Sequence, residues 1–166
     1  MKSVLIVERN EVLMDQMISL VKEADVDIQI RAVRTDGEAY QYAMKGNVSL
    51  FIVDVVLTTR FSQDASGINF AAQMRMVERY RHTPIIMMSM LEDIEMYAYK
   101  DLHCYTYLEK PFDKRYVIKV IREALDAPVS YKKKYPLLQK RRCADQKGRC
   151  GYCIHRKFQE GPYDPF

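Results

Sequence analysis

The run LFIVDVVL, at residues 50–57, is apolar throughout except for Asp54. A nearly continuous apolar run of this kind is typical of a parallel strand that is buried on both faces, because a half-exposed antiparallel strand alternates between apolar and polar residues. The runs VLIV at 4–7 and PIIMM at 84–88 have the same character. We therefore expect a buried parallel strand at Leu50–Asp54 that ends on a carboxylate, with similar strands beside it.

Strand-like runs alternate with longer amphipathic stretches through the first 127 residues. The expected strands are Ser3–Val7, Ile28–Val33, Leu50–Asp54, Pro84–Ser89 and Cys104–Leu108. The expected helices are Glu11–Ala24, Asp36–Met44 with Asp36 as its N-cap, a helix from Ser66 through Val77, Asp93–Lys100 and Asp113–Leu125. Because helical crossovers between parallel strands are right-handed, this alternation predicts an α/β fold with a doubly wound five-stranded parallel sheet.

In a sheet of this kind the ligand site lies outside the carboxyl ends of the strands. Glu8 and Arg9 follow the first expected strand, Asp54 ends the third, Ser89 ends the fourth and Lys110 follows the fifth. Two acids, a hydroxyl group and a lysine are therefore expected to meet at one edge of the sheet. No Gly-rich phosphate loop or nucleophile elbow follows any strand, which disfavours a small α/β enzyme.

The motifs VLIVE, LFIVDVVL, IIMMS and YLEKPF occur in this order at the strand ends. With them, roughly residues 1–126 resemble bacterial response-regulator receiver domains. The resemblance implies a (βα)5 flavodoxin-like receiver fold without enzymatic activity of its own. It also implies that Asp54 accepts a phosphoryl group from a sensor histidine kinase.

The resemblance assigns further roles around the acceptor. Glu8, Asp54 and the backbone carbonyl of Val56 match the groups that hold Mg²⁺ in the family, while Ser89 and Lys110 match those that contact the phosphoryl oxygens. This division is chemically reasonable, because phosphoryl transfer depends on positioning and on offsetting the developing negative charge.

Arg9 departs from the family pattern, since receivers usually carry two consecutive acids after the first strand. A cation in place of the second acid disfavours Mg²⁺ by several kcal/mol at an effective dielectric constant of about 20. We expect weakened Mg²⁺ binding and slow, or less metal-dependent, phosphorylation of Asp54. Two alternatives stay open: Arg9 pairs with Asp54 or with the incoming phosphoryl group, or it points to solvent beside a degenerate pocket.

Other residues indicate how the signal would be passed on. Tyr107 matches the aromatic side chain whose rotation reports phosphorylation, and Cys104 is interpreted as a packed thiol. The segments SGINFAAQMR at 66–75 and AYKDLHCYTYLEKPFD at 98–113 are similar to receivers that precede LytTR DNA-binding domains. The likeness implies transcription regulation, promoter DNA as a partner of a full-length parent, and a homodimer through the fourth and fifth helices.

The composition changes near Pro128. Residues 1–128 carry 16 Lys and Arg against 19 Asp and Glu, whereas residues 129–166 carry 10 against 3. We therefore expect a receiver domain at 1–127 and a basic, irregular tail at 128–166 without an independent fold. No apolar run approaches the 18 to 20 or so residues of a membrane span, and the first strand is too short for a signal peptide, so a cytoplasmic protein without a membrane partner is expected.

The tail has several interpretations. Cys143, Cys150, Cys153 and His155 are candidate zinc ligands, although their spacing is atypical, and the Lys/Arg run is a candidate nucleic-acid arm. The alternative function is then a stand-alone or degenerate receiver that acts through protein contacts. A further hypothesis comes from the codons: permitted codons from Arg141 onward, read from the second base, spell the strand-like string EDVRIRKDDVVIVFIENFKKAHTTH. The tail would then be an out-of-frame reading of a LytTR domain, and its cysteines would carry no function.

Overall fold

The computed structural model describes residues 2–57, 65–90, 102–127, 141–144 and 150–153. Its first part contains the following strands and helices: β1 (Ser3–Val7), α1 (Glu11–Ala24), β2 (Gln29–Val33), α2 (Asp36–Lys45), β3 (Leu50–Asp54), α3 (Ser66–Met76), the 3-10 helix η1 (Glu78–Tyr80), β4 (Ile85–Ser89), β5 (Thr106–Glu109) and α5 (Lys114–Asp126). Each of the five predicted strands is present. The helix predicted at 93–100 lies outside the described residues.

The five strands form one parallel sheet in the order β2-β1-β3-β4-β5. This order reverses direction between β1 and β3, as in doubly wound flavodoxin-like sheets. The predicted doubly wound five-stranded parallel sheet is thereby confirmed. It places β1, β3 and β4 at the centre, where their carboxyl ends lie next to one another.

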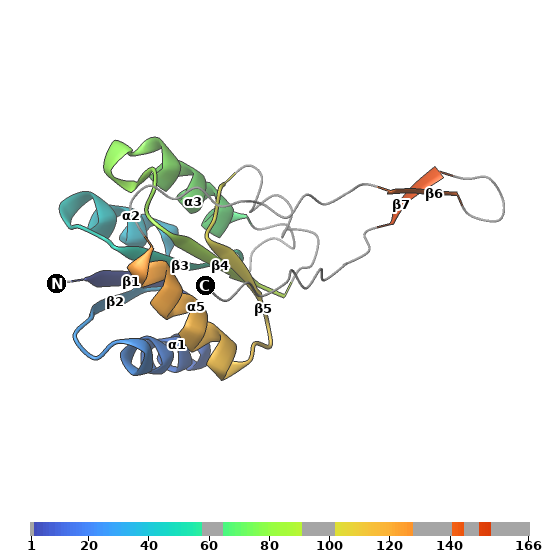
Figure 1. Cartoon of the computed structure of the whole chain (residues 1–166). Helices are drawn as coiled ribbons and strands as arrows, with labels where there is room; N and C mark the ends of the chain where they lie inside the picture. Colours follow the sequence, from blue (N-terminus) through green and yellow to red (C-terminus); the bar gives the residue numbers. More distant parts are fainter. Residues whose placement is uncertain (1, 58–64, 91–101, 128–140, 145–149, 154–166) are drawn as a thin grey trace, which may run out of the picture. The chain divides into compact units, whose positions relative to one another are not determined.

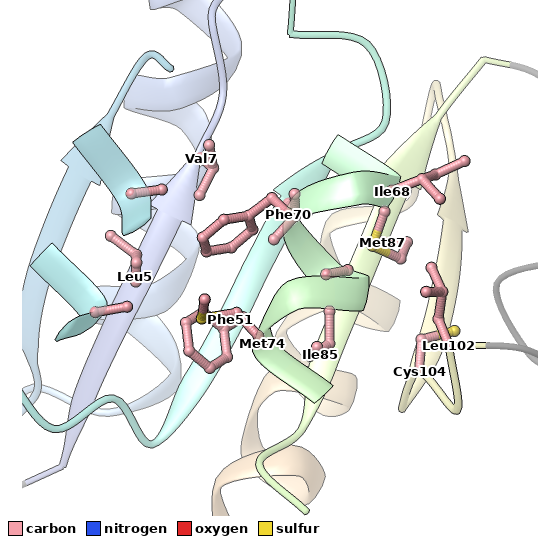
Figure 2. Packing of buried hydrophobic residues seen from close by; sticks show 14 of the residues in the cluster. Leu5, Val7, Phe51, Ile68, Phe70, Met74, Ile85, Met87, Leu102 and Cys104 are labelled. Carbon is pink, nitrogen blue, oxygen red and sulfur yellow. The ribbon is translucent and has the colours of Figure 1, made fainter. Parts of the chain in front are cut away.

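Alternate residues of the strands fill two apolar layers, one on each face of the sheet. Leu5 and Val7 belong to the layer under α2 and α3, and Val4 and Ile6 to the layer under α1 and α5 (Figure 1). Figure 2 shows the first layer, in which the Phe51 ring meets Phe70 edge-on at 5.9 Å between centroids. Burial on both faces explains why the central strands are almost wholly apolar.

Three helices, α1, α2 and α5, begin at side chains that accept a backbone hydrogen bond. The Asp113 carboxylate accepts one from the Tyr116 N–H at 2.9 Å at the start of α5. At α2 the cap is Thr35, whose hydroxyl accepts from the Glu38 N–H at 3.2 Å. The expectation that Asp36 is this cap is wrong: Thr35 is the extended residue, with φ −129° and ψ 153°, and Asp36 is already helical.

Arg75, near the end of α3, connects several backbone segments at the amino edge of the sheet. Its guanidinium donates to the carbonyl oxygens of Thr83 at 2.7 Å, Leu102 at 2.8 Å and His103 at 3.1 Å. It also donates to the Tyr80 carbonyl at 3.0 Å. Charge-assisted hydrogen bonds of this kind are among the stronger ones in proteins. They hold the segments that lead into β4 and β5 against α3.

The chain divides into two compact units, Met1–Lys132 and Lys133–Phe166. In the second unit, β6 (Arg141–Ala144) pairs antiparallel with β7 (Cys150–Cys153). The expected boundary at 127/128 and the expected lack of an independent fold in the tail stay predictions. Within the described residues, no helix is long and apolar enough to cross a membrane.

Candidate functional site

Three charged side chains meet at the carboxyl edge of the sheet. The Lys110 ammonium lies 2.8 Å from Glu8 Oε2 and 3.2 Å from Asp54 Oδ1. The exposed fractions of the three side chains are 10% for Lys110, 2% for Glu8 and 11% for Asp54. A partly buried lysine therefore bridges two buried carboxylates.

The strand register explains how these residues meet. β1 and β3 are neighbours with Val7 opposite Val53, so Glu8 and Asp54 follow side by side. Lys110 follows β5, which lies beyond β4, and its backbone N–H donates to the Ser89 carbonyl at 2.9 Å. The long lysine side chain thus crosses the end of β4 to reach the central strands.

Glu8 has both carboxylate oxygens engaged. Oε1 accepts the backbone N–H of Asn10 at 2.8 Å, and Oε2 accepts from Lys110. The Asn10 side chain in turn caps α1 by accepting the Leu13 N–H at 3.1 Å. Glu8 is therefore fixed to the start of α1. Sequence reasoning missed Asn10, although an Asn directly before an amphipathic stretch is a known N-cap signal.

The environment of Asp54 favours its protonated form more than water does. Burial raises the pKa of this carboxyl from 3.8 to about 6. The positive charge of Lys110 opposes this rise, the negative charge of Glu8 adds to it, and hydrogen bonds from Lys110 and the Val56 backbone oppose it. Lys110 consequently favours the ionised form of Asp54 against the effect of burial on its pKa.

The other residues assigned by resemblance lie around this group. Ser89 is buried at the end of β4, one residue beyond Met88, which pairs with Asp54. Val56 is half-buried just past the end of β3, and Tyr107 is buried within β5 in the layer under α2 and α3. Their roles in holding a metal, contacting a phosphoryl group and switching stay predictions.

Arg9 is exposed at the same edge. Its side chain makes no ion pair or hydrogen bond with another residue of the described part of the chain, so the pairing with Asp54 considered above is not observed. Lys110 occupies that position instead. A nearby cation, Arg34 after β2, is paired with Glu11.

Gly67, the second residue of α3, lies against the backbone of Asp54. A Cβ atom there would stand 1.9 Å from the Asp54 carbonyl oxygen, and the Gly67 N–H donates to the Val55 carbonyl at 3.1 Å. No side chain fits at this position without moving Asp54. Sequence reasoning missed this contact; a glycine directly after the expected start of a helix was the available signal.

The cysteines of the chain lie in the core of the first unit and in the two strands of the second. Cys104 is 1% exposed in the layer under α2 and α3, as expected of a packed thiol. Cys143 lies in β6, Cys150 and Cys153 lie in β7, and His155 is outside the described residues. In the described part of the chain, no cluster of three or more His, Cys, Asp or Glu side chains is arranged to hold a metal.

The arrangement at the sheet edge is a poor fit for a tightly held Mg²⁺. This ion needs nearly octahedral oxygen ligands and commonly takes one or two carboxylates together with water. The expected ligands are Glu8, Asp54 and the Val56 carbonyl, but each Glu8 oxygen already accepts a hydrogen bond and the ammonium of Lys110 stands between the two carboxylates. The ligand assignment stays a prediction.

Gly67→Ala is expected to destabilise the protein by about 1–3 kcal/mol, because its Cβ would overlap the Asp54 carbonyl oxygen and force the backbone apart. Gly37→Ala in α2 is the matched control. Its Cβ would meet no atom within 4 Å, so stability should stay the same or rise by up to about 1 kcal/mol. Urea unfolding of both variants measures the effect, and equal stability of the two would contradict the assigned contact.

Asp54→Asn is expected to stabilise the protein at neutral pH. Because burial raises the Asp54 pKa from 3.8 to about 6, the wild-type protein loses stability through this group as the pH rises between those values. The loss is on the order of 3 kcal/mol once the carboxyl is ionised. The free energy of unfolding of the variant minus that of the wild type, measured by urea titration with chelator present, should rise from about pH 4 to about pH 7. A flat difference over this range would be inconsistent with the raised pKa.

Comparison with known proteins shows similarity in sequence and in fold. The family model described as the response regulator receiver domain matches residues 4–122. The chemotaxis response regulator CheY4 of Vibrio cholerae is 25% identical, with a TM-score of 0.60 over 75% of this chain and 98% of that one. A sensor protein from Polaromonas sp. JS666 is 20% identical, with a TM-score of 0.64 over 75% of this chain and 96% of that one.

A third similar structure is the Mn²⁺-bound form of the response regulator Rcp1, which is 20% identical with a TM-score of 0.55 over 74% of this chain and 90% of that one. At this identity the likeness shows the fold alone. The comparison with curated proteins gave no match. Since the family model spans most of the chain, the protein belongs to the response regulator receiver domain family of two-component signalling, which implies a histidine kinase as partner.

Proposed function

We propose that Asp54 accepts a phosphoryl group from a sensor histidine kinase and that this modification shifts the domain between two conformations that control an output. The observation that carries the proposal is the buried Asp54 at a strand end, with the Lys110 ammonium 3.2 Å from its Oδ1 atom. Burying a carboxylate beside a second carboxylate costs stability, so a purely structural role does not account for the burial of Asp54.

The residues present suit phosphoryl transfer. Attack on phosphorus requires the ionised carboxylate, and Lys110 favours this form against the effect of burial. After transfer the same ammonium and the Ser89 hydroxyl are the expected partners for the phosphoryl oxygens, and both contacts are charge-assisted because the phosphoryl oxygens are anionic. The chain thus acts as a switch that is itself modified and turns over no substrate of its own.

Metal dependence is the part of the proposal where this chain departs from its family. Receiver domains typically bind Mg²⁺, and the Rcp1 structure is described as an Mn²⁺-bound form. In this chain Arg9 stands where a second acid is usual, and Glu8 is engaged by Lys110. We therefore propose that Mg²⁺ binding is weakened.

For the output, we propose a LytTR-type DNA-binding domain that regulates transcription. The support is the similarity of residues 66–75 and 98–113 to receivers of that class. Signal transfer would use Tyr107 as the switch side chain and a homodimer through the fourth and fifth helices, with promoter DNA bound only by a full-length parent. A cytoplasmic location follows from this function.

Phosphorylation of the full chain by acetyl phosphate tests the main proposal. Intact-mass spectrometry should show the addition of one phosphoryl group to the wild-type protein and none to Asp54→Asn. Asp27→Asn, a change of the same type at an exposed residue before β2, should leave the labelling unchanged. Labelling of Asp54→Asn at the wild-type level would place the acceptor elsewhere.

The nucleotide sequence tests the proposed output. When the nucleotide sequence beyond codon 141 is translated in all three frames, a shifted frame should continue into a LytTR domain. Purified protein should then hold no zinc, because the tail cysteines would have no role. One equivalent of zinc, together with no LytTR domain in any frame, would favour the stand-alone receiver with a metal-binding tail.

A further inference from the structure

We propose that Lys110 and Arg9 together offset the negative charge of the acceptor site in place of a divalent ion, so that Asp54 takes up a phosphoryl group without Mg²⁺. The inference rests on the proposed function and concerns how that same site works. It names Arg9 as a residue that contacts the phosphoryl group.

The first argument is the charge of the site. Its two carboxylates, Glu8 and Asp54, are matched by two cations, Lys110 and Arg9. The site is therefore neutral without any bound ion. Two buried carboxylates with a single cation between them would attract a further positive charge, and here the chain itself supplies that charge at the residue directly after Glu8.

The second argument is the state of Glu8. This side chain is 2% exposed, and its two oxygens accept from the Asn10 N–H and from Lys110. A metal ion would have to displace the ammonium from Glu8 and would be repelled by it, because like charges interact strongly in a partly buried site. Arg9, the next residue along the chain, adds a second positive charge at this edge of the sheet.

The third argument is that Arg9 is available. Lys110 is held by Glu8 and Asp54, and Arg34 is paired with Glu11. Arg9, by contrast, is exposed, and the described part of the chain offers its guanidinium no hydrogen bond or ion pair. A guanidinium matches the oxygens of a phosphoryl group in a two-pronged contact, which an ammonium does not.

The chemical step balances without a metal or a proton donor. With acetyl phosphate, a carboxylate oxygen of Asp54 forms a bond to phosphorus while the bond between phosphorus and the acetyl oxygen breaks. Acetate leaves as an anion, so the total charge and the number of protons are unchanged. No electrons are exchanged with an oxidant or reductant.

The test compares labelling of the full chain by acetyl phosphate in excess EDTA and in saturating Mg²⁺. Wild-type rates should agree within about twofold, whereas Arg9→Asp should be slower by about tenfold or more in EDTA and should recover with Mg²⁺. Arg81→Asp carries the same change of charge at an exposed residue before β4, at the opposite edge of the sheet, and should behave like the wild type.

A second readout is independent of phosphorylation. Electron paramagnetic resonance of added Mn²⁺ should show binding to Arg9→Asp at least about tenfold tighter than to the wild type or to Arg81→Asp. Wild-type labelling that requires Mg²⁺, or equal Mn²⁺ affinity in all three proteins, would overturn this inference while leaving Asp54 as the acceptor. Failure of the wild type to be labelled in both conditions would instead remove the proposed function, and this inference with it.

Discussion

The ammonium of Lys110 between Glu8 and Asp54 is the contact on which the site depends. Two carboxylates that are this buried and this close repel each other, and each loses hydration. A single cation at 2.8 and 3.2 Å offsets these effects in part and joins the ends of three strands. As a result, a change in the charge of any one of these three side chains alters the electrostatic environment of the other two, which is suitable for a switch.

The sequence allowed the strands to be predicted closely because strands buried on both faces leave a continuous apolar signal. The predicted bounds of Ser3–Val7 and Leu50–Asp54 agree with β1 and β3, and the polar residue that ends β3 pointed to the site. Thr35 and Asp36 show where this approach fails, because two adjacent residues are both good N-caps and only the backbone conformation distinguishes them.

The contacts within the site could not be predicted in the same way. That Lys110 engages Glu8 as well as Asp54, and leaves Arg9 without a partner in the described region, depends on which strands are neighbours and on how far one side chain reaches. The close approach of Gly67 to the Asp54 carbonyl depends on how α3 packs against the end of β3. Neither distance is encoded in residue type or spacing alone.

The hydrogen bonds of Arg75 bear on how a change at the site can travel. They bind the end of α3 to the backbone before β4, at Thr83, and before β5, at Leu102 and His103. Both strands are thus anchored at the edge opposite Asp54. Because the amino ends of β4 and β5 are held in this way, a change at Asp54 is expected to act on the carboxyl ends of these strands, where Ser89 and Lys110 lie.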